Sequence, residues 1–241
     1  MALLDPIATK LKGGKLPDYL LAKGKFLLKC GEPLAARQAI ELASKVSQDN
    51  HAPEKEIGLL QTFAAYTYMA TGERDRALAL MEGALPTQNG HAWQVAESMR
   101  RLFDAAKRVI EESGDPKSTL DDAFGYTRSI GWELYLAPLP RLAAELSSAA
   151  LESGSEPDFV RSAIRKRKMA PPDRAGVAWP WPLKISTLGR FEVRRDDSPI
   201  RFEGKAPRKP LELLKSIIAI GGRGVARERL FTPFFTTKAS G

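Results

Sequence analysis

One stretch of this 241-residue chain shows the clearest succession of secondary-structure patterns: Leu183–Leu230, LKISTLGRFEVRRDDSPIRFEGKAPRKPLELLKSIIAIGGRGVARERL. Apolar and polar residues alternate in Lys184–Leu188, Phe191–Arg194 and Ile200–Glu203. Because alternate side chains of a strand share one face, the three segments predict short strands. Asp, Ser and Pro are frequent turn residues, so Asp196–Pro199 predicts a tight turn between the second strand and the third.

A helix is predicted after these strands. Pro210 suits the first helical position, where a missing N–H costs little. An apolar face follows at three- and four-residue steps, formed by Leu211, Leu214, Ile217 and Ile218. Gly221-Gly222 predicts the end of this helix. Gly224–Ala226 then predicts a short extended link, and Arg227–Leu230 predicts the first turn of a second helix.

The run TLGRFEV…I.F.GKAPRKPLELLKSIIAIGGRGVARERL resembles the OmpR-type winged helix of transcriptional regulators of the SARP and MalT-like families. In those families a four-stranded platform precedes three helices, the third helix reads the major groove, and a β-hairpin wing follows. The resemblance covers 183–230 and implies a partial winged-helix domain. Beyond Leu230 the sequence FTPFFTTKASG has no helical period, so 231–241 is predicted to be an irregular tail without a recognition helix.

Composition narrows the class of protein. Hydrophobic residues make up 43% and charged residues 27% of the chain, as in soluble globular proteins. No apolar run reaches the roughly 18–20 residues of a membrane span, which predicts no membrane partner. A single cysteine excludes an internal disulfide framework and favours the cytoplasm. With only two histidines besides, neither a metal site nor a cofactor is expected.

Charge is unevenly distributed. Residues 158–230 contain 18 Lys and Arg against 8 Asp and Glu, whereas 1–157 contain 18 against 21. A basic end favours contact with phosphates, and the alternative is a solvated basic segment. The candidate phosphate contacts cluster around the two predicted helix starts and are Lys205, Arg208, Lys209, Arg223, Arg227 and Arg229.

The preceding part of the chain reads as repeated helical hairpins. After a lead-in over 1–16, helical patterns fill 17–169, and one pattern returns after 41 residues. In both copies a Gly-Glu turn separates two helices, at Gly31 and at Gly72, and a small residue follows five places later, at Ala36 and Ala77. This resembles the tetratricopeptide helix–turn–helix. The Trp and Leu-Gly positions of that motif are not met, so a generic array of helical hairpins is the alternative.

Four further helices are predicted in this part, with a loop over 86–90 before the first. The first covers 91–110, and the second begins within 118–121 and runs to about 130. The third covers 141–151, and the fourth runs from 157 to about 168. The cluster Lys166–Lys168 suits a helix C-terminus, with phosphate contact as the alternative. Residues 170–182 contain four prolines and predict a linker, which Trp179 and Trp181 dock against the strands. The stretch from Tyr126 to Pro172 resembles the segment that joins repeats to the winged helix in MalT-like regulators.

No constellation of catalytic residues is present in the sequence. Cys30 has no histidine near it and is predicted to be a small buried side chain. A phosphate loop is missing, because Gly204-Lys205-Ala206 lacks the first glycine and the hydroxyl. We therefore expect a non-enzymatic fragment of a bacterial transcription regulator. Its repeats would contact a protein or effector, and its incomplete winged helix would bind DNA weakly and without sequence preference. The alternative is a repeat-only interaction module with a vestigial C-terminal piece.

Overall fold

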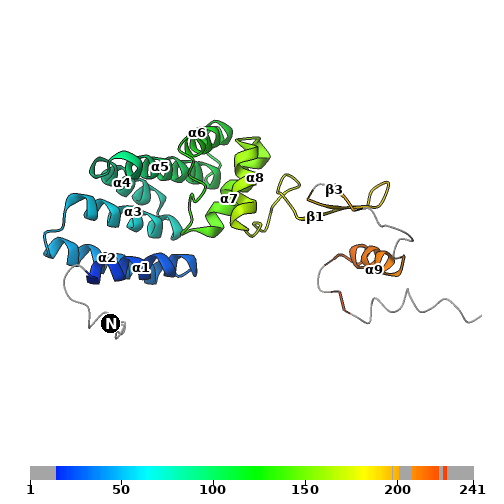
Figure 1. Ribbon diagram of the computed structural model, residues 1–241, viewed down its shortest axis with the longest axis horizontal. Coiled ribbons are helices and arrows are strands. Elements are labelled where there is room, and N and C mark those ends of the chain that lie inside the picture. Colours follow the sequence, from blue (N-terminus) through cyan, green and yellow to red (C-terminus); the bar gives the residue numbers. More distant parts are fainter. Residues whose placement is uncertain (1–14, 197, 201–207, 223–224, 227–241) are drawn as a thin grey trace, which may run out of the picture. The chain divides into compact units, whose positions relative to one another are not determined.

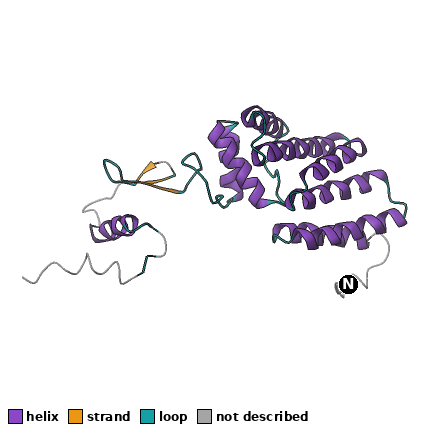
Figure 2. Cartoon of the chain, turned by 180° about the vertical axis from the view of Figure 1, so that it is seen from behind, coloured by secondary structure: helices purple, strands orange, loops and turns teal. Residues whose placement is uncertain are grey.

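The computed structural model describes residues 15–196, 198–200, 208–222 and 225–226 (Figure 1). Contacts between Cα positions divide the chain into two compact units, Met1–Pro180 and Trp181–Gly241. We call the first the helical unit and the second the sheet unit. Most described residues are helical, and the remaining regular structure is one small antiparallel sheet (Figure 2), so the prediction of a mainly α chain is confirmed.

The helical unit is built from helices that follow one another along the chain. They are α1 (Lys15–Lys29), α2 (Pro33–Asp49), α3 (Glu54–Ala70), α4 (Arg74–Ala84), α5 (Gly90–Ile110), α6 (Pro116–Ser129), α7 (Pro140–Ser153) and α8 (Pro157–Arg167), with a 3-10 turn, η2 (Leu85–Thr87), after α4. Each helix packs against the next, and α1 also contacts α3 as α5 contacts α7. Because η2 covers Leu85–Thr87, the first residues of the predicted loop over 86–90 form a helical turn.

The first two hairpins, α1–α2 and α3–α4, bury corresponding residues 41 positions apart. The fully enclosed pairs are Ala36 with Ala77, Ile40 with Met81, and Ala43 with Ala84. Gly24 marks a close helix crossing, because a Cβ built on it would lie 2.6 Å from Cγ1 of Ile40. Ala65 occupies the corresponding buried place in α3. Small residues at these places allow the paired helices to approach closely.

The Gly-Glu turns end α1 and α3 in the same way. Gly31 and Gly72 have φ of 80° and 86°, which glycine adopts without the cost that a Cβ imposes. The amide of Glu32 donates to the carbonyl of Leu27 over 2.9 Å, and the amide of Glu73 donates to that of Tyr68 over 2.9 Å. These six-to-one bonds, with a glycine before them, form Schellman motifs, so both predicted turns are confirmed.

Aromatic contacts join the later helices. The rings of Tyr66 and Phe103 meet edge to face at 5.3 Å, and those of Phe124 and Tyr135 do the same at 5.3 Å. The buried Tyr135 hydroxyl lies 3.0 Å from Oγ of Ser147. These pairs connect α3 to α5, and α6 to α7 through the loop that precedes α7.

Several predicted helix boundaries differ from the structure by one or a few residues. Helix α6 begins at Pro116 rather than within 118–121, because Asp115 is the N-cap and its carboxylate accepts the Lys117 amide at 3.0 Å. Helix α1 begins at Lys15, two residues before the predicted start. The lead-in over 1–14 lies outside the described residues.

The proline-rich segment after α8 belongs to the helical unit as far as Pro180. Trp179 is only 3% exposed. A Cβ on Gly176 would lie 3.0 Å from the carboxylate of Glu152, which places this segment beside the end of α7. Within the helical unit, residues 170–180 are therefore packed on the helices rather than extended away from them.

The sheet unit contains β1 (Leu183–Ser186), β2 (Glu192–Arg195), β3 (Ser198–Pro199) and α9 (Arg208–Ala219). The strands form one antiparallel sheet in the order β1-β2-β3. Ser198 and Pro199 pair with Arg195 and Arg194 of β2, so the last two residues of the predicted turn over 196–199 belong to a strand. Asp196 has φ of 48°, which Asp tolerates better than most residues.

Helix α9 presents its predicted apolar face inward, since Leu211, Leu214, Ile217 and Ile218 are all half-buried. Nζ of Lys215 lies 4.8 Å from the ring centroid of Phe191 at the start of β2. Among the described residues of this unit none is fully buried, and Leu188 is 94% exposed. Phe191 and Ile200 are likewise only half-buried.

Candidate ligand pocket and basic residues

Two of the six predicted phosphate contacts fall on described residues. Arg208 begins α9, and Lys209 follows it with an exposed side chain. Lys205, Arg223, Arg227 and Arg229 lie outside the described residues. The structure therefore places Arg208 and Lys209 in the first turn of α9 and leaves the wider cluster a prediction.

Two basic residues of the sheet unit were missed by the sequence reasoning. Arg190 and Arg195 are exposed, and within the described part of the chain no carboxylate lies within ion-pair distance of either. Arg194, by contrast, pairs with Glu192 at 2.9 Å. An excess of arginine between β1 and β3 was visible in the sequence, but which of these side chains are paired depends on the strand register.

Two members of the basic cluster Lys166–Lys168, at the end of α8, have a structural role. Nζ of Lys166 lies 2.6 Å from Oε1 of Glu133. Arg167 donates to the carbonyl oxygen of Tyr135 over 2.7 Å, and its guanidinium lies 5.1 Å from the Tyr135 ring centroid. Burial lowers the pKa of Arg167 from its ordinary value. These contacts tie α8 to the loop before α7.

A pocket of about 580 Å³ opens in the helical unit at the edge that carries the Gly-Glu turns. The ends of α1, α3 and α5 meet the beginning of α7 there. Its apolar lining comes from Leu28, Met69, Ile110, Leu139 and Leu142, of which Leu28, Met69 and Leu139 are buried. Both turn glycines, Gly31 and Gly72, are also part of the lining. Pockets of roughly 300–1,000 Å³ with mainly apolar walls are the usual size for small-molecule sites.

Three basic side chains and one acidic side chain line the same pocket: Lys29, Arg74, Arg141 and Glu145. Lys29 and Arg141 have no ion pair with any residue that the structure describes. Arg74 is half-buried, and its nearest carboxylate, on Glu111, is 3.8 Å away. Its Nε is buried without a hydrogen-bond partner in the described part of the protein, an exception to the usual satisfaction of buried polar groups.

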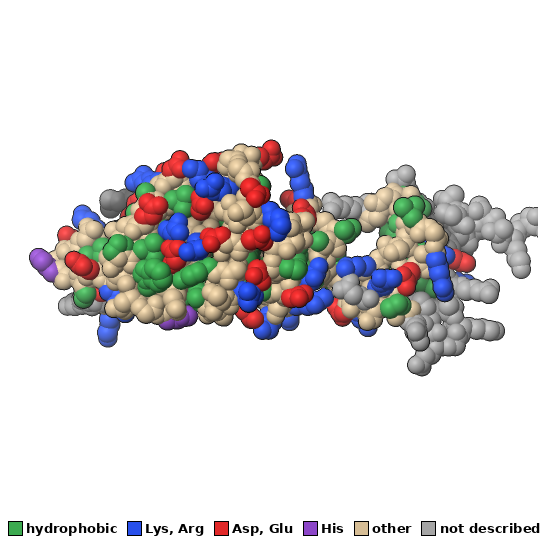
Figure 3. Space-filling view, turned by 90° about the horizontal axis from the view of Figure 1, so that it is seen from above, with side chains coloured by type: hydrophobic (Ala, Val, Ile, Leu, Met, Phe, Trp, Pro, Cys, Tyr) green, Lys and Arg blue, Asp and Glu red, His purple; other side chains and the backbone are tan. Residues whose placement is uncertain are grey.

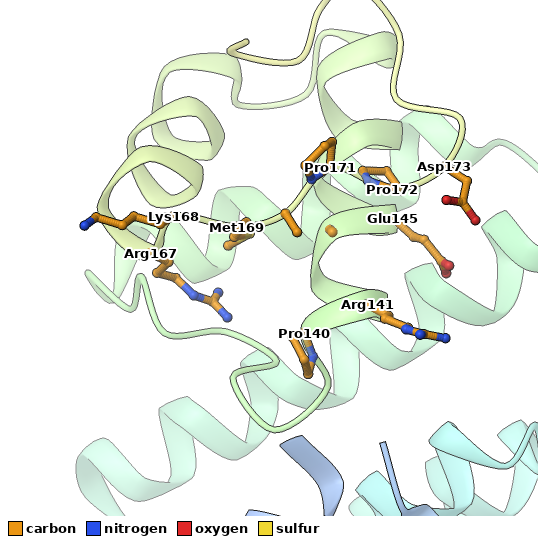
Figure 4. Close-up of a pocket in the computed structure, with 11 residues that line it drawn as sticks. Pro140, Arg141, Glu145, Arg167, Lys168, Met169, Pro171, Pro172 and Asp173 are labelled. Atoms are coloured by element: carbon orange, nitrogen blue, oxygen red, sulfur yellow. The ribbon is translucent and has the colours of Figure 1, made fainter. Parts of the chain in front are cut away.

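A second hollow of about 520 Å³ adjoins this pocket, and the two share Pro140, Arg141 and Glu145. It lies between α7, the end of α8 and the proline-rich segment. Figure 4 shows Arg141 and Glu145 projecting from α7 on the same side, with Asp173 near the Glu145 carboxylate. The positive charge of Arg141 is therefore available to both hollows.

Elsewhere on the helical unit, charges of both signs are mixed. Figure 3 shows basic and acidic side chains interspersed over the face seen from above. The ion pairs include Arg37 with Glu73 at 2.7 Å, and Glu97 with Arg100 and Arg101 at 2.8 Å. The hydrogen bond from Arg100 holds the pKa of Glu97 below its ordinary value, and Arg101 adds to the effect.

Cys30 is exposed and lines the pocket, so the prediction of a buried cysteine was wrong. The sequence suggested burial because Cys30 follows an apolar helical run, but α1 ends at Lys29 and the turn carries Cys30 to the surface. Among the described residues no group of three or more His, Cys, Asp or Glu side chains is placed to hold a metal ion. In the same part of the chain, every helix is too short or too polar to span a membrane.

Comparison with known proteins finds no matching family model, no matching curated protein and no matching solved structure. The functional reading therefore rests on the residues and their geometry.

Proposed function

We propose that this chain is a non-enzymatic, cytoplasmic fragment of a bacterial transcription regulator of the SARP or MalT-like type. In this proposal the helical unit contacts a protein or an effector. The sheet unit is an incomplete OmpR-type winged helix that binds DNA weakly through phosphates. The observation that carries the proposal is the order of elements in the sheet unit: antiparallel β1, β2 and β3 are followed by α9, whose first turn carries Arg208 and Lys209.

A tetratricopeptide-like reading of the helical unit is supported by the two matched hairpins. Gly24 and Ala65 lie at close crossings of the first helices, and Ala36 and Ala77 lie at the corresponding places in the second helices. The second copy also has Tyr68 three residues after Ala65, which is the spacing of Gly and Tyr in the tetratricopeptide pattern. Arrays of this kind serve as surfaces for partners rather than as catalytic sites.

Weak and non-specific DNA binding follows from charge. Phosphate contacts by Lys and Arg supply most of the non-specific affinity, with dissociation constants of about 10⁻⁴–10⁻⁶ M at physiological salt. Discrimination among sequences needs side chains on base edges, each good bidentate contact being worth about 1–3 kcal/mol. Among the described residues of the sheet unit, no helix follows α9 that could supply such contacts.

The alternative is a repeat-only interaction module whose C-terminal piece is vestigial. One observation favours it: among the described residues of the sheet unit none is fully buried, and Leu183, Ile185 and Leu188 are exposed apolar side chains. A domain that has lost its function would be expected to show such an incomplete core. Binding to DNA distinguishes the two candidates, because a vestigial piece needs no phosphate contacts.

The test is a fluorescence anisotropy titration of the full chain against two duplexes of unrelated sequence. We expect dissociation constants that agree within about threefold, and a loss of about a thousandfold in affinity between 50 and 200 mM salt, as six phosphate contacts imply. Absence of binding at 50 mM salt would favour the repeat-only module. A preference of a hundredfold or more for one duplex would contradict both candidates.

A further inference from the structure

The pocket at the turn edge of the helical unit combines an apolar lining with an excess of positive charge. Its apolar lining includes the buried side chains of Leu28, Met69 and Leu139. Its basic residues are Lys29, Arg74 and Arg141, against the single carboxylate of Glu145. These groups come from three segments far apart in the sequence, around residues 28–29, 69–74 and 139–145, so the combination is a product of the fold.

The basic residues of this pocket have fewer close carboxylates than several others in the helical unit. Arg37, Arg100, Arg101 and Lys166 each have a carboxylate oxygen within 2.8 Å. Lys29 and Arg141 have none among the described residues, and Arg74 is left with a distant carboxylate and an unsatisfied Nε. Two of the three cations that line this hollow therefore have no ion pair with a described residue, and the third has only the long pair with Glu111.

We propose that this pocket binds a small organic anion with an apolar body, such as a carboxylate or phosphate ester of medium length. The apolar part would lie against the apolar lining, which includes Leu28, Met69 and Leu139. The anionic group would lie near Arg141, with Lys29 and Arg74 adding to the positive potential. A volume of about 580 Å³ suits a ligand of this size better than an extended peptide.

The proposal deepens the effector-contact role of the helical unit and rests on it. It makes no use of DNA, so failure of the binding experiment leaves the phosphate contacts of the sheet unit untouched. Loss of DNA binding would likewise leave this pocket as proposed. The two proposals thus fail separately.

Cys30 supplies a reporter for the pocket. It is the only cysteine of the chain, is exposed, and belongs to the pocket lining. Alkylation by iodoacetamide, a neutral reagent, measures the access of a small molecule to this thiol. A ligand that fills the pocket covers Cys30 and slows the reaction, whereas a ligand bound elsewhere leaves the rate unchanged.

The experiment uses the full chain and four probes: octanoate, octanol, octylammonium and inorganic phosphate. Octanoate is expected to slow alkylation of Cys30 by tenfold or more at saturation. Octanol and octylammonium share its apolar chain without the negative charge and should protect at least tenfold less well at equal concentration. Phosphate shares the negative charge without the chain and should also protect weakly. Calorimetry measures the affinity for octanoate independently of the thiol.

Substitution identifies the residue that receives the anionic group. Arg141→Gln should weaken octanoate binding by about tenfold, because hydrogen bonds to charged groups contribute more than neutral ones. Lys45→Gln is the matched control, since Lys45 is exposed and outside the pocket. The alkylation rate in 8 M urea gives the unprotected limit for each variant, and circular dichroism verifies that each variant is folded.

Three outcomes would overturn the proposal. Protection of Cys30 by octanol equal to that by octanoate would show that the pocket recognises the apolar chain and not the negative charge. Unchanged octanoate affinity in both Arg141→Gln and Lys29→Gln would place the anion elsewhere. Protection by a Glu-rich peptide, with no binding of octanoate up to 10 mM, would assign the pocket to a protein partner instead.

Discussion

Truncation of Ile40 and of Met81 tests whether the first two hairpins share one packing scheme. Both side chains are fully enclosed, at corresponding places in α2 and α4. Replacing a buried Ile or Met by Ala lowers the free energy of unfolding by about 2–5 kcal/mol, because lost transfer energy and a residual cavity add together. Since Ile40 packs at the close crossing of Gly24, neighbouring atoms have little freedom to fill the gap. We therefore expect about 3–5 kcal/mol for each variant.

In a protein of this size 1 kcal/mol corresponds to a shift in Tm of about 2–4 °C, so each substitution should lower Tm by roughly 6–20 °C. Urea denaturation followed by far-ultraviolet circular dichroism gives the free energies directly. Leu34→Ala is the matched control, because Leu34 is 65% exposed and should change stability by less than about 0.5 kcal/mol. A cost below about 1 kcal/mol for either Ile40→Ala or Met81→Ala, with the other at full size, would refute the 41-residue correspondence.

Three further outcomes follow from individual contacts. Glu97→Gln should cost about 1 kcal/mol at pH 7, as urea denaturation measures, because it removes charge-assisted hydrogen bonds from Arg100 and Arg101. The pKa of Glu97 is held below 4.5 in the fold. Its contribution to the free energy of unfolding is therefore present above pH 4.5 and is lost as the pH falls through the lowered value. A difference in free energy of unfolding between wild type and variant that persists undiminished at pH 2 would contradict this. Trp179→Ala should speed tryptic cleavage after Arg174 at least fivefold by releasing the proline-rich segment, and an unchanged rate by mass spectrometry would show that Trp179 does not hold it. Gly31→Ala should lower the free energy of unfolding by about 1 kcal/mol, because the φ of residue 31 is 80°. Gly83→Ala should raise it by about 0.5–1 kcal/mol in the same urea assay, because Gly83 lies in a helix and an added Cβ meets open space.

The helical elements of this chain were predictable because their signals are local. The glycines at 31, 72 and 154 and the prolines at 140 and 157 stand at helix ends, and the structure has a helix boundary at each. The 3-10 turn over Leu85–Thr87 and the cap by Asp115 were missed, since a turn of three residues and a single cap leave little periodicity.

The pocket could not be predicted from the sequence. It depends on Leu28, Met69, Ile110 and Leu139 meeting at one edge, and these residues are separated by about thirty to forty positions. Neither helical period nor composition says which ends of successive helices meet. For the same reason the sequence could not predict the exposure of Cys30 or the burial of Trp179. Each is decided by where one segment turns back on another.

The salt dependence of DNA binding tests the proposed function most directly. The slope of log K against log salt should be about −5 for the full chain if the six predicted phosphate contacts are made. Replacing Lys205, Arg208, Lys209, Arg223, Arg227 and Arg229 with Gln should reduce this slope by about five. Replacing six exposed basic residues of the helical unit, Lys15, Lys45, Lys55, Arg108, Lys117 and Arg128, should leave it unchanged. An unchanged slope in the first variant, or an equal loss in the second, would contradict the assignment of DNA contact to the sheet unit.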